Sequence, residues 1–156
     1  MTASDPPYTF LFPLWIAYRS LQDLLDQVLA PSGLSAEDFA VYSALARVGE
    51  ARPSAVAEFL RLPPTTVTAV IARLRQRGHV ATTRDASDGR AKILRLTRDG
   101  AAAHQHAMSL FEPLLNTLEA QIGSRTGALD SGLAALQRAI DRAAEKTIGD
   151  RPADRD

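Results

Sequence analysis

The sequence predicts a mainly α fold with a small β-hairpin (α+β), in which a winged helix-turn-helix core is flanked by N- and C-terminal helices. Three observations predict this fold. Two short helical segments meet at a tight turn, Arg61–Pro63. A charged hairpin with an Asp-Gly turn, leading into a helix start, follows them in the stretch Arg84–Gly100. In both terminal segments, apolar residues recur at spacings of three and four.

The first two helices are defined by their apolar faces and their ends. Pro31-Ser32-Gly33 ends the first, and Ser35 can cap the second, with acidic residues in its first turn. Gly49 ends that second helix. The apolar seam of the first helix comprises Leu11, Leu14, Tyr18, Leu21, Leu25 and Val28. The buried side of the second comprises Phe39, Tyr42, Leu45 and Ala46.

The helix-turn-helix pairs a segment at Arg52–Leu60 with a second helix at Pro64–Arg77, which Gly78 ends. One face of the second helix is an apolar stripe: Val67, Val70, Ile71 and Leu74. The opposite face has small hydroxyl residues near the N-terminus and Arg and Gln further along: Thr65, Thr68, Ala69, Ala72, Arg73 and Gln76. Such a face suits a DNA major groove, and a helix N-terminus favours a phosphate.

The hairpin has a basic tip. Asp88-Gly89 supplies the turn, and the basic residues around it are Arg84, Arg90 and Lys92. A thin basic loop can reach a minor groove, and Asp85 or Asp88 could orient Arg90 toward it. A solvated surface hairpin is the alternative. Leu94 and Leu96 share one face of the second strand, and Thr97 can cap the helix that follows.

After Gly100 a long helix runs to about Ile122 with Pro113 inside it, and a break spans Gly123–Gly127. A second seam follows, made of Leu129, Leu133, Leu136, Ile140 and Ala143. The terminal seams exceed what a small core needs, so we expect them to form a dimer; packing within one subunit is the alternative. The expected organisation is a single domain at 1–156, with the core at 35–100, dimerisation helices at 8–30 and 101–148, and a flexible tail at 149–156.

Charge is segregated along a chain whose net charge is zero. Residues 61–98 contain nine basic and two acidic residues, a balance of +7, and the remaining chain has nine basic and sixteen acidic residues, a balance of −7. This distribution predicts a basic patch for phosphates beside an acidic remainder. The chain has no cysteine, which excludes disulfides, thiolate zinc sites and thiol redox sensing. The absence of a long apolar run and of a secretion signal predicts a cytoplasmic protein without membrane partners.

From Leu34 to Gly100 the chain resembles bacterial multiple-antibiotic-resistance (MarR-type) transcriptional regulators. The matching segments are Leu34-Ser35, Ala55-Val56-Ala57, Thr66-Val67-Thr68, Arg73-Leu74, Arg77-Gly78-His79-Val80, Asp88-Gly89-Arg90 and Leu96-Thr97-x-x-Gly100. Two positions depart from the family pattern: Arg61 stands where a glycine is usual, and Pro63 stands where a hydroxyl residue usually caps the helix. The resemblance implies a dimeric DNA-binding regulator that responds to a small aromatic or phenolic effector.

The sequence favours a non-enzymatic protein without metal or cofactor. His104 and His106 are two apart on a helix, so their side chains diverge and cannot hold one metal. His79 is expected to pack or to contact a phosphate. We find no Ser-His-Asp set, phosphate-binding glycine loop or paired inward carboxylates.

The predicted function is a homodimeric repressor that blocks polymerase at a pseudo-palindromic operator and is released by a small molecule; the alternative is a winged-helix module that binds protein and not DNA. The predicted DNA-binding residues are Pro64, Thr65, Thr66, Thr68, Ala69, Arg73, Gln76, Arg84, Asp88, Arg90 and Lys92. The predicted effector pocket comprises Trp15, Tyr18, Arg19, Phe39, Tyr42, His104 and Met108, for which ordinary core packing is the alternative.

Overall fold

The computed structural model describes residues 10–84 and 92–149, with side chains to residue 146. The chain divides into two compact units, Met1–Leu114 and Leu115–Asp156, and one helix, α5 (Arg98–Ile122), continues from the first into the second. The expected flexible tail therefore lies, but for Gly149, outside the described residues. None of the described helices is both long enough and apolar enough to cross a membrane.

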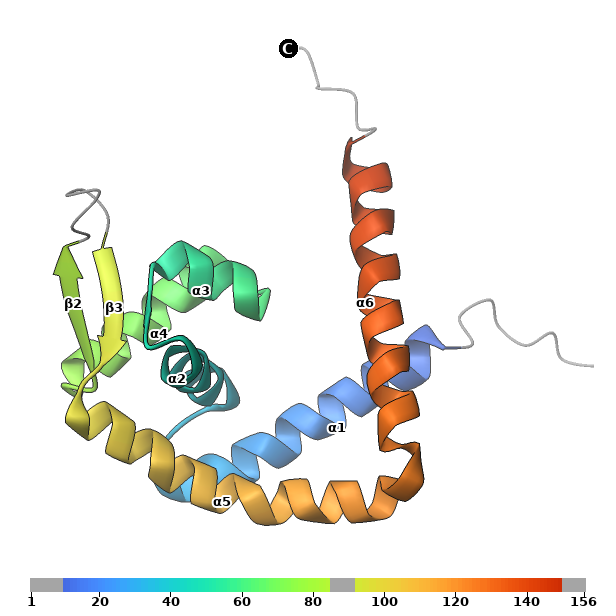
Figure 1. Cartoon of the computed structure of the whole chain (residues 1–156), viewed down its shortest axis with the longest axis horizontal. Helices are drawn as coiled ribbons and strands as arrows, with labels where there is room; N and C mark the ends of the chain where they lie inside the picture. Colours follow the sequence, from blue (N-terminus) through green and yellow to red (C-terminus); the bar gives the residue numbers. More distant parts are fainter. Residues whose placement is uncertain (1–9, 85–91, 150–156) are drawn as a thin grey trace, which may run out of the picture. The chain divides into compact units, whose positions relative to one another are not determined.

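The first unit is the predicted winged helix-turn-helix with an additional N-terminal helix (Figure 1). Its helices are α1 (Leu11–Leu29), a short 3₁₀ turn η1 (Ala30–Ser32), α2 (Ala36–Val48), α3 (Pro53–Leu60), α4 (Pro64–Gln76) and the first part of α5. Its strands are β1 (Glu50–Ala51), β2 (Val80–Arg84) and β3 (Lys92–Leu96). This architecture confirms the predicted fold class.

The sheet has three antiparallel strands in the order β1-β3-β2. The hairpin register pairs Val80 with Leu96 at its base and Arg84 with Lys92 at its described end. The sequence predicted this hairpin but not β1, whose residue Ala51 pairs with Leu94. A strand of two residues has no alternation to detect, and only its partner makes it a strand.

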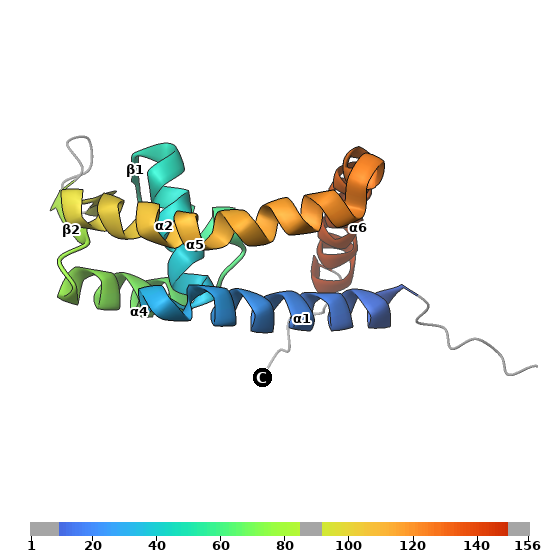
Figure 2. The same ribbon diagram turned by 90° about the horizontal axis from the view of Figure 1, so that it is seen from below.

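The core lies where α2, α4 and β3 meet. Leu45, Leu74 and Leu94 are almost completely buried, and every member of the predicted α4 stripe is buried. The C-terminal end of α1 reaches this core through Leu29, whereas its N-terminal part extends away from the cluster of α2, α3 and α4 (Figure 2). The α1 apolar side chains that remain exposed include Leu11, Phe12, Trp15, Ile16 and Tyr18.

The caps predicted from the sequence are confirmed. Ser35 and Asp38 form a reciprocal capping box at the start of α2, each side chain accepting a hydrogen bond from the other residue's amide. Gly78 follows α4 with a φ of 73°, and the His79 amide donates back to the Leu74 carbonyl at 2.9 Å. The Thr97 hydroxyl caps α5 by accepting from the Gly100 amide at 3.0 Å.

The second unit comprises the end of α5, the 3₁₀ turn η2 (Gly123–Arg125) and α6 (Thr126–Gly149). The break predicted at Gly123–Gly127 is shorter than expected, because Gly127 already belongs to α6. No described side chain between residues 115 and 146 is buried. The predicted α6 seam is therefore not buried in the single chain: Leu129, Leu133 and Ile140 are each close to half accessible, and Leu136 is half-buried.

Candidate nucleic-acid interface

Helix α4 turns its apolar stripe into the core and its polar face to solvent. Thr65, Thr68, Ala69, Arg73 and Gln76 are exposed as predicted, as is Pro64, whereas Thr66 is half-buried. The Thr68 hydroxyl donates to the Pro64 carbonyl at 2.8 Å. The two lone pairs of the Thr68 hydroxyl oxygen remain free to accept hydrogen bonds.

The start of α4 has no capping side chain. Pro63 occupies the N-cap position and Pro64 begins the helix, and no side chain accepts a hydrogen bond from the first turn. The amides of Thr65 and Thr66 lie in the first turn, where an α-helix offers its amides no carbonyl partner. The departure of Pro63 from the family pattern therefore leaves a helix end that suits an acceptor from outside, such as a phosphate oxygen.

The C-terminal half of α4 is fastened to the rest of the core. Arg73 places a guanidinium nitrogen 2.7 Å from the Asp38 carboxylate, which is buried at the start of α2. Arg77 donates to the Gly33 carbonyl at 3.1 Å. The sequence analysis assigned Arg73 to DNA; the structure gives it an intramolecular partner, although 44% of the side chain stays exposed.

The turn after α4 is anchored from two sides. The Tyr42 hydroxyl and the His79 ring Nδ1 are 2.5 Å apart, so His79 packs within the protein, one of the two roles expected for it. Burial raises the pKa of the Tyr42 hydroxyl, and nearby Arg77 acts in the opposite direction. On the other side, the Thr97 hydroxyl donates to the Gly78 carbonyl at 2.8 Å. These bonds hold the end of α4 against both α2 and the start of α5.

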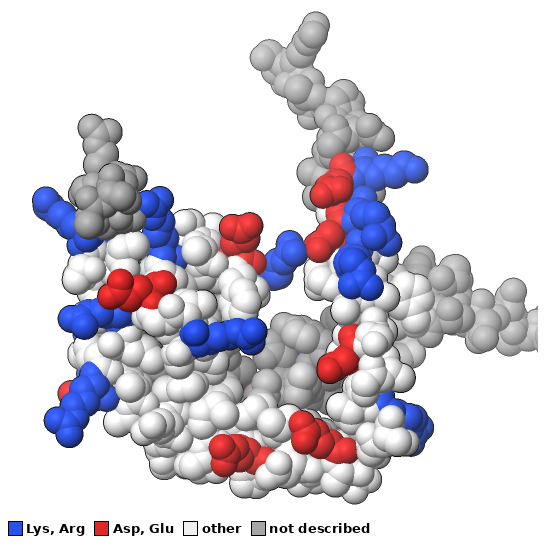
Figure 3. Space-filling model, in the orientation of Figure 1, with Lys and Arg blue, Asp and Glu red and all other residues white. Residues whose placement is uncertain are grey.

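The wing strands carry basic side chains at their described ends. Arg84 and Lys92 are exposed and face each other in the hairpin register, and basic side chains gather around these strand ends (Figure 3). The predicted contacts Asp88 and Arg90 lie outside the described residues. Arg75 belongs to the basic segment 61–98 but was not among the predicted DNA contacts; with Gln76 it lines an open groove of about 520 Å³ between α4 and β2. The signal for Arg75 in the sequence was the density of arginines at the end of α4, where Arg73, Arg75 and Arg77 alternate.

The predicted effector pocket is divided in the structure. Phe39 stacks against His104 with ring centroids 5.9 Å apart, while Met108 packs against the core. The His104 Nε2 lies 3.1 Å from the Ser43 hydroxyl, and burial lowers the pKa of that imidazole. Tyr42 is also in the core, but it is bonded to His79.

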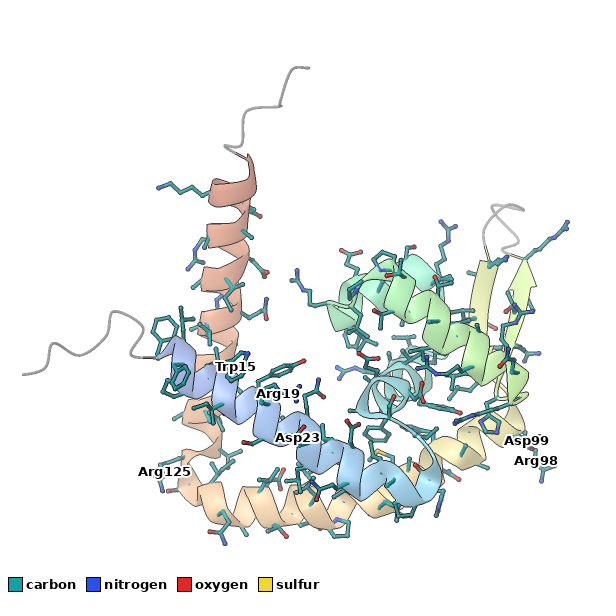
Figure 4. All side chains as sticks on the ribbon, turned by 180° about the vertical axis from the view of Figure 1, so that it is seen from behind. Trp15, Arg19, Asp23, Arg98, Asp99 and Arg125 are labelled. Atoms are coloured by element: carbon teal, nitrogen blue, oxygen red, sulfur yellow. The ribbon has the colours of Figure 1, made fainter. Side chains whose placement is uncertain are left out.

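The three α1 members of that pocket lie on the exposed part of the helix. Trp15 is 59% exposed and stacks on Phe12, and Tyr18 accepts a hydrogen bond from Gln22 at 2.7 Å. Arg19 pairs with Asp23 on the same helix at 3.4 Å, and both are labelled in Figure 4. Within one chain the predicted set therefore separates into a group in or against the core and an exposed group on α1, and the effector pocket stays a prediction.

Comparison with known proteins relates the middle of the chain to one family. Residues 32–91 match the model of the MarR family, and no curated protein matches the chain. Among solved structures, the chain is similar to the transcriptional regulator MosR of M. tuberculosis in complex with DNA, with 26% identity, a TM-score of 0.74, and 86% of this chain and 97% of that chain covered. It is also similar to BpsR of Bordetella bronchiseptica, whose DNA binding is regulated by 6-hydroxynicotinic acid, with 26% identity, a TM-score of 0.67, and coverage of 83% and 96%.

The repressor CouR, bound to a 23-mer DNA duplex, shares the fold, with 24% identity, a TM-score of 0.77, and coverage of 87% of this chain and 99% of that one. The family match spans the helix-turn-helix and reaches into the wing, and these structural matches extend over both units. Residues 32–91 are therefore similar to the MarR family, and the chain shares the fold of the solved transcriptional regulators it matches.

Proposed function

We propose that this protein is a DNA-binding transcriptional regulator that acts as a homodimeric repressor. The observation that carries the proposal is the exposed polar face of α4 beside the basic wing strands, with an uncapped helix start at one end. In this proposal α4 enters a major groove, and the wing contacts the backbone or the adjacent minor groove. The DNA complexes of MosR and CouR support it.

Release by a small aromatic or phenolic molecule is the finer part of the proposal. The ligand-regulated relative BpsR supports it. Repression follows if the bound dimer covers the site that polymerase needs. A winged-helix module that binds only protein would share the fold but would not need a basic wing.

The test is a binding titration on the promoter fragment upstream of the protein's own gene, repeated over a range of salt concentrations. Arg84→Ala should weaken binding and reduce the salt slope by about one, because one phosphate contact is lost. Arg47→Ala removes an exposed arginine from the last turn of α2 and is the matched control, which should change neither quantity. Equal effects of the two variants, or no preference for that fragment over unrelated DNA, would contradict the proposal.

A further inference from the structure

A hollow of about 500 Å³ lies in the winged core, away from the polar face of α4. It is bounded by the end of α2, by β1, by α3 and by β3. None of the residues proposed for DNA contact or for the effector pocket lines it. Its volume falls within the range of small-molecule sites.

The hollow has a buried apolar floor and an exposed apolar rim. Ala44 and Val56 form part of the floor and are 3% and 2% exposed. Val48 and Phe59 line it from α2 and α3 and are 52% and 57% exposed, and Ile93 contributes from β3. A ring seated here would remove these apolar side chains from water, which favours binding.

The two charged residues of the lining indicate that the ligand is neutral. Glu50 and Arg52 are the charged residues among the lining, and their opposite charges favour neither an anion nor a cation. The Glu50 carboxylate can accept a hydrogen bond from an N–H or O–H group. We propose that this hollow is a binding site for a neutral aromatic molecule of one or two fused rings that carries one hydrogen-bond donor.

Occupancy of the hollow acts on the elements that position the wing. Ala51, which lines the hollow, pairs with Leu94 of the central strand β3, and that strand leads to Lys92 at the wing. The floor residue Val56 belongs to α3, which packs against α4 in the helix-turn-helix. A ligand between α3 and β3 therefore alters how the wing sits beside α4 and weakens DNA binding; this second step rests on the proposed function.

The first experiment measures binding to the whole protein without DNA, with indole as the probe. Indole is neutral, planar and a hydrogen-bond donor. Methyl NMR signals of Val48, Val56 and Ile93 should shift in a saturable manner with one shared dissociation constant. Ala55→Leu adds bulk to the lining of the hollow and should weaken indole binding at least tenfold.

Ala102→Leu is the matched control, because it adds the same bulk at an exposed position of α5 outside the hollow and should leave binding unchanged. If Ala55→Leu does not fold, Phe59→Ala, at an exposed position, replaces it and should weaken binding at least fivefold. Absence of saturable shifts up to millimolar indole, or equal binding by the filled variant, overturns the site. Shifts of the same signals on dilution of the protein alone would also overturn it, because a second copy of the chain would then cover the hollow.

The second experiment repeats the DNA titration with saturating indole. DNA affinity should fall at least fivefold for the native chain and should not change for Ala55→Leu. Unchanged DNA affinity in the native chain overturns the regulatory step. If indole binds but the chain has no affinity for DNA, the proposed function fails and the binding site stands.

Discussion

Arg61 adopts a left-handed backbone conformation, with a φ of 54°, directly after α3. Its amide donates to the carbonyls of Ala57 and Glu58, so the geometry that ends α3 is kept although the family's usual glycine is absent. This conformation costs a side-chain-bearing residue about 1 kcal/mol that glycine avoids. Relief of this strain at Arg61 should therefore raise the free energy of unfolding.

We therefore expect Arg61→Gly to raise the free energy of unfolding by about 1 kcal/mol relative to Arg61→Ala, measured by urea denaturation. The alanine variant is the control, because it removes the side chain and its contacts but keeps the strain. Equal stability of the two variants would show that the left-handed conformation costs nothing at this position.

Gly100 allows the start of α5 to approach the turn after α4. A Cβ at this position would overlap the backbone carbonyl of His79, which cannot move without displacing the turn. Gly100→Ala should therefore lower the free energy of unfolding by at least about 1–3 kcal/mol, the usual cost of overpacking. At Gly127, by contrast, a new Cβ would meet no other atom. Gly127→Ala should therefore stabilise α6 by up to about 1 kcal/mol, because alanine favours a helix more than glycine does. Thermal unfolding of the two variants checks both signs.

His104 makes stability depend on pH. Burial lowers its pKa in the folded protein, so the unfolded chain binds a proton more readily in the interval below about pH 6.5. The free energy of unfolding should therefore fall as pH drops through 6.5 toward the lowered folded pKa, and become level below it. His104→Gln removes the titration and can still bond Ser43, so the stability difference between native and variant should change over this interval. A constant difference from pH 8 to pH 5 would exclude His104 as the cause.

At the scale of elements, the link between Arg73 and Asp38 connects α4 to the capping box of α2. Removal of Arg73 leaves the buried Asp38 carboxylate without this hydrogen bond, and removal of the Asp38 carboxylate leaves the Arg73 guanidinium without it. We expect Arg73→Ala to cost about 1–2 kcal/mol of stability, reduced from the value for a buried pair because Arg73 is half exposed. A double-mutant cycle with Asp38→Asn measures the coupling.

The same cycle separates the two roles of Arg73 when it is repeated on DNA. If Arg73 also contacts a phosphate, Arg73→Ala weakens binding while Asp38→Asn, which frees the guanidinium, does not. Loss of affinity in both variants would instead show that Arg73 acts by positioning α4.

Local patterns predicted most of the elements, and long-range contacts account for what they missed. The α4 stripe, Gly78 and the Thr97 cap were readable because each depends on neighbours within four residues. The pairing of Arg73 with Asp38 spans 35 positions, and β1 exists through its contact with β3. Helical spacing identifies an apolar face of α1 but not what that face packs against, so the effector pocket that joins α1 to the core stays a prediction.

At the scale of the whole molecule, the second unit has no buried core in the described part of one chain. The exposed seam of α6 and the exposed apolar side chains of α1 are the surfaces that a partner would cover. Two recognition helices in a dimer require half-sites about one helical turn apart, roughly 34 Å, so the operator should be a pseudo-palindrome. The dimer contact then sets the spacing of the helices that contact DNA.

Leu133→Asp and Leu136→Asp should therefore give monomers that lose DNA affinity, although every DNA-facing residue is intact. The seam residue Leu133 is 49% exposed in the single chain, so a carboxylate there costs little until a second apolar surface covers it. Ser131→Asp places the same charge on the opposite side of α6 and is the control that should remain dimeric. Sedimentation beside a DNA titration tests both effects in the same samples. A monomeric Leu133→Asp protein with native DNA affinity, or a native chain that is monomeric at micromolar concentration, would refute the dimer and with it the spacing requirement.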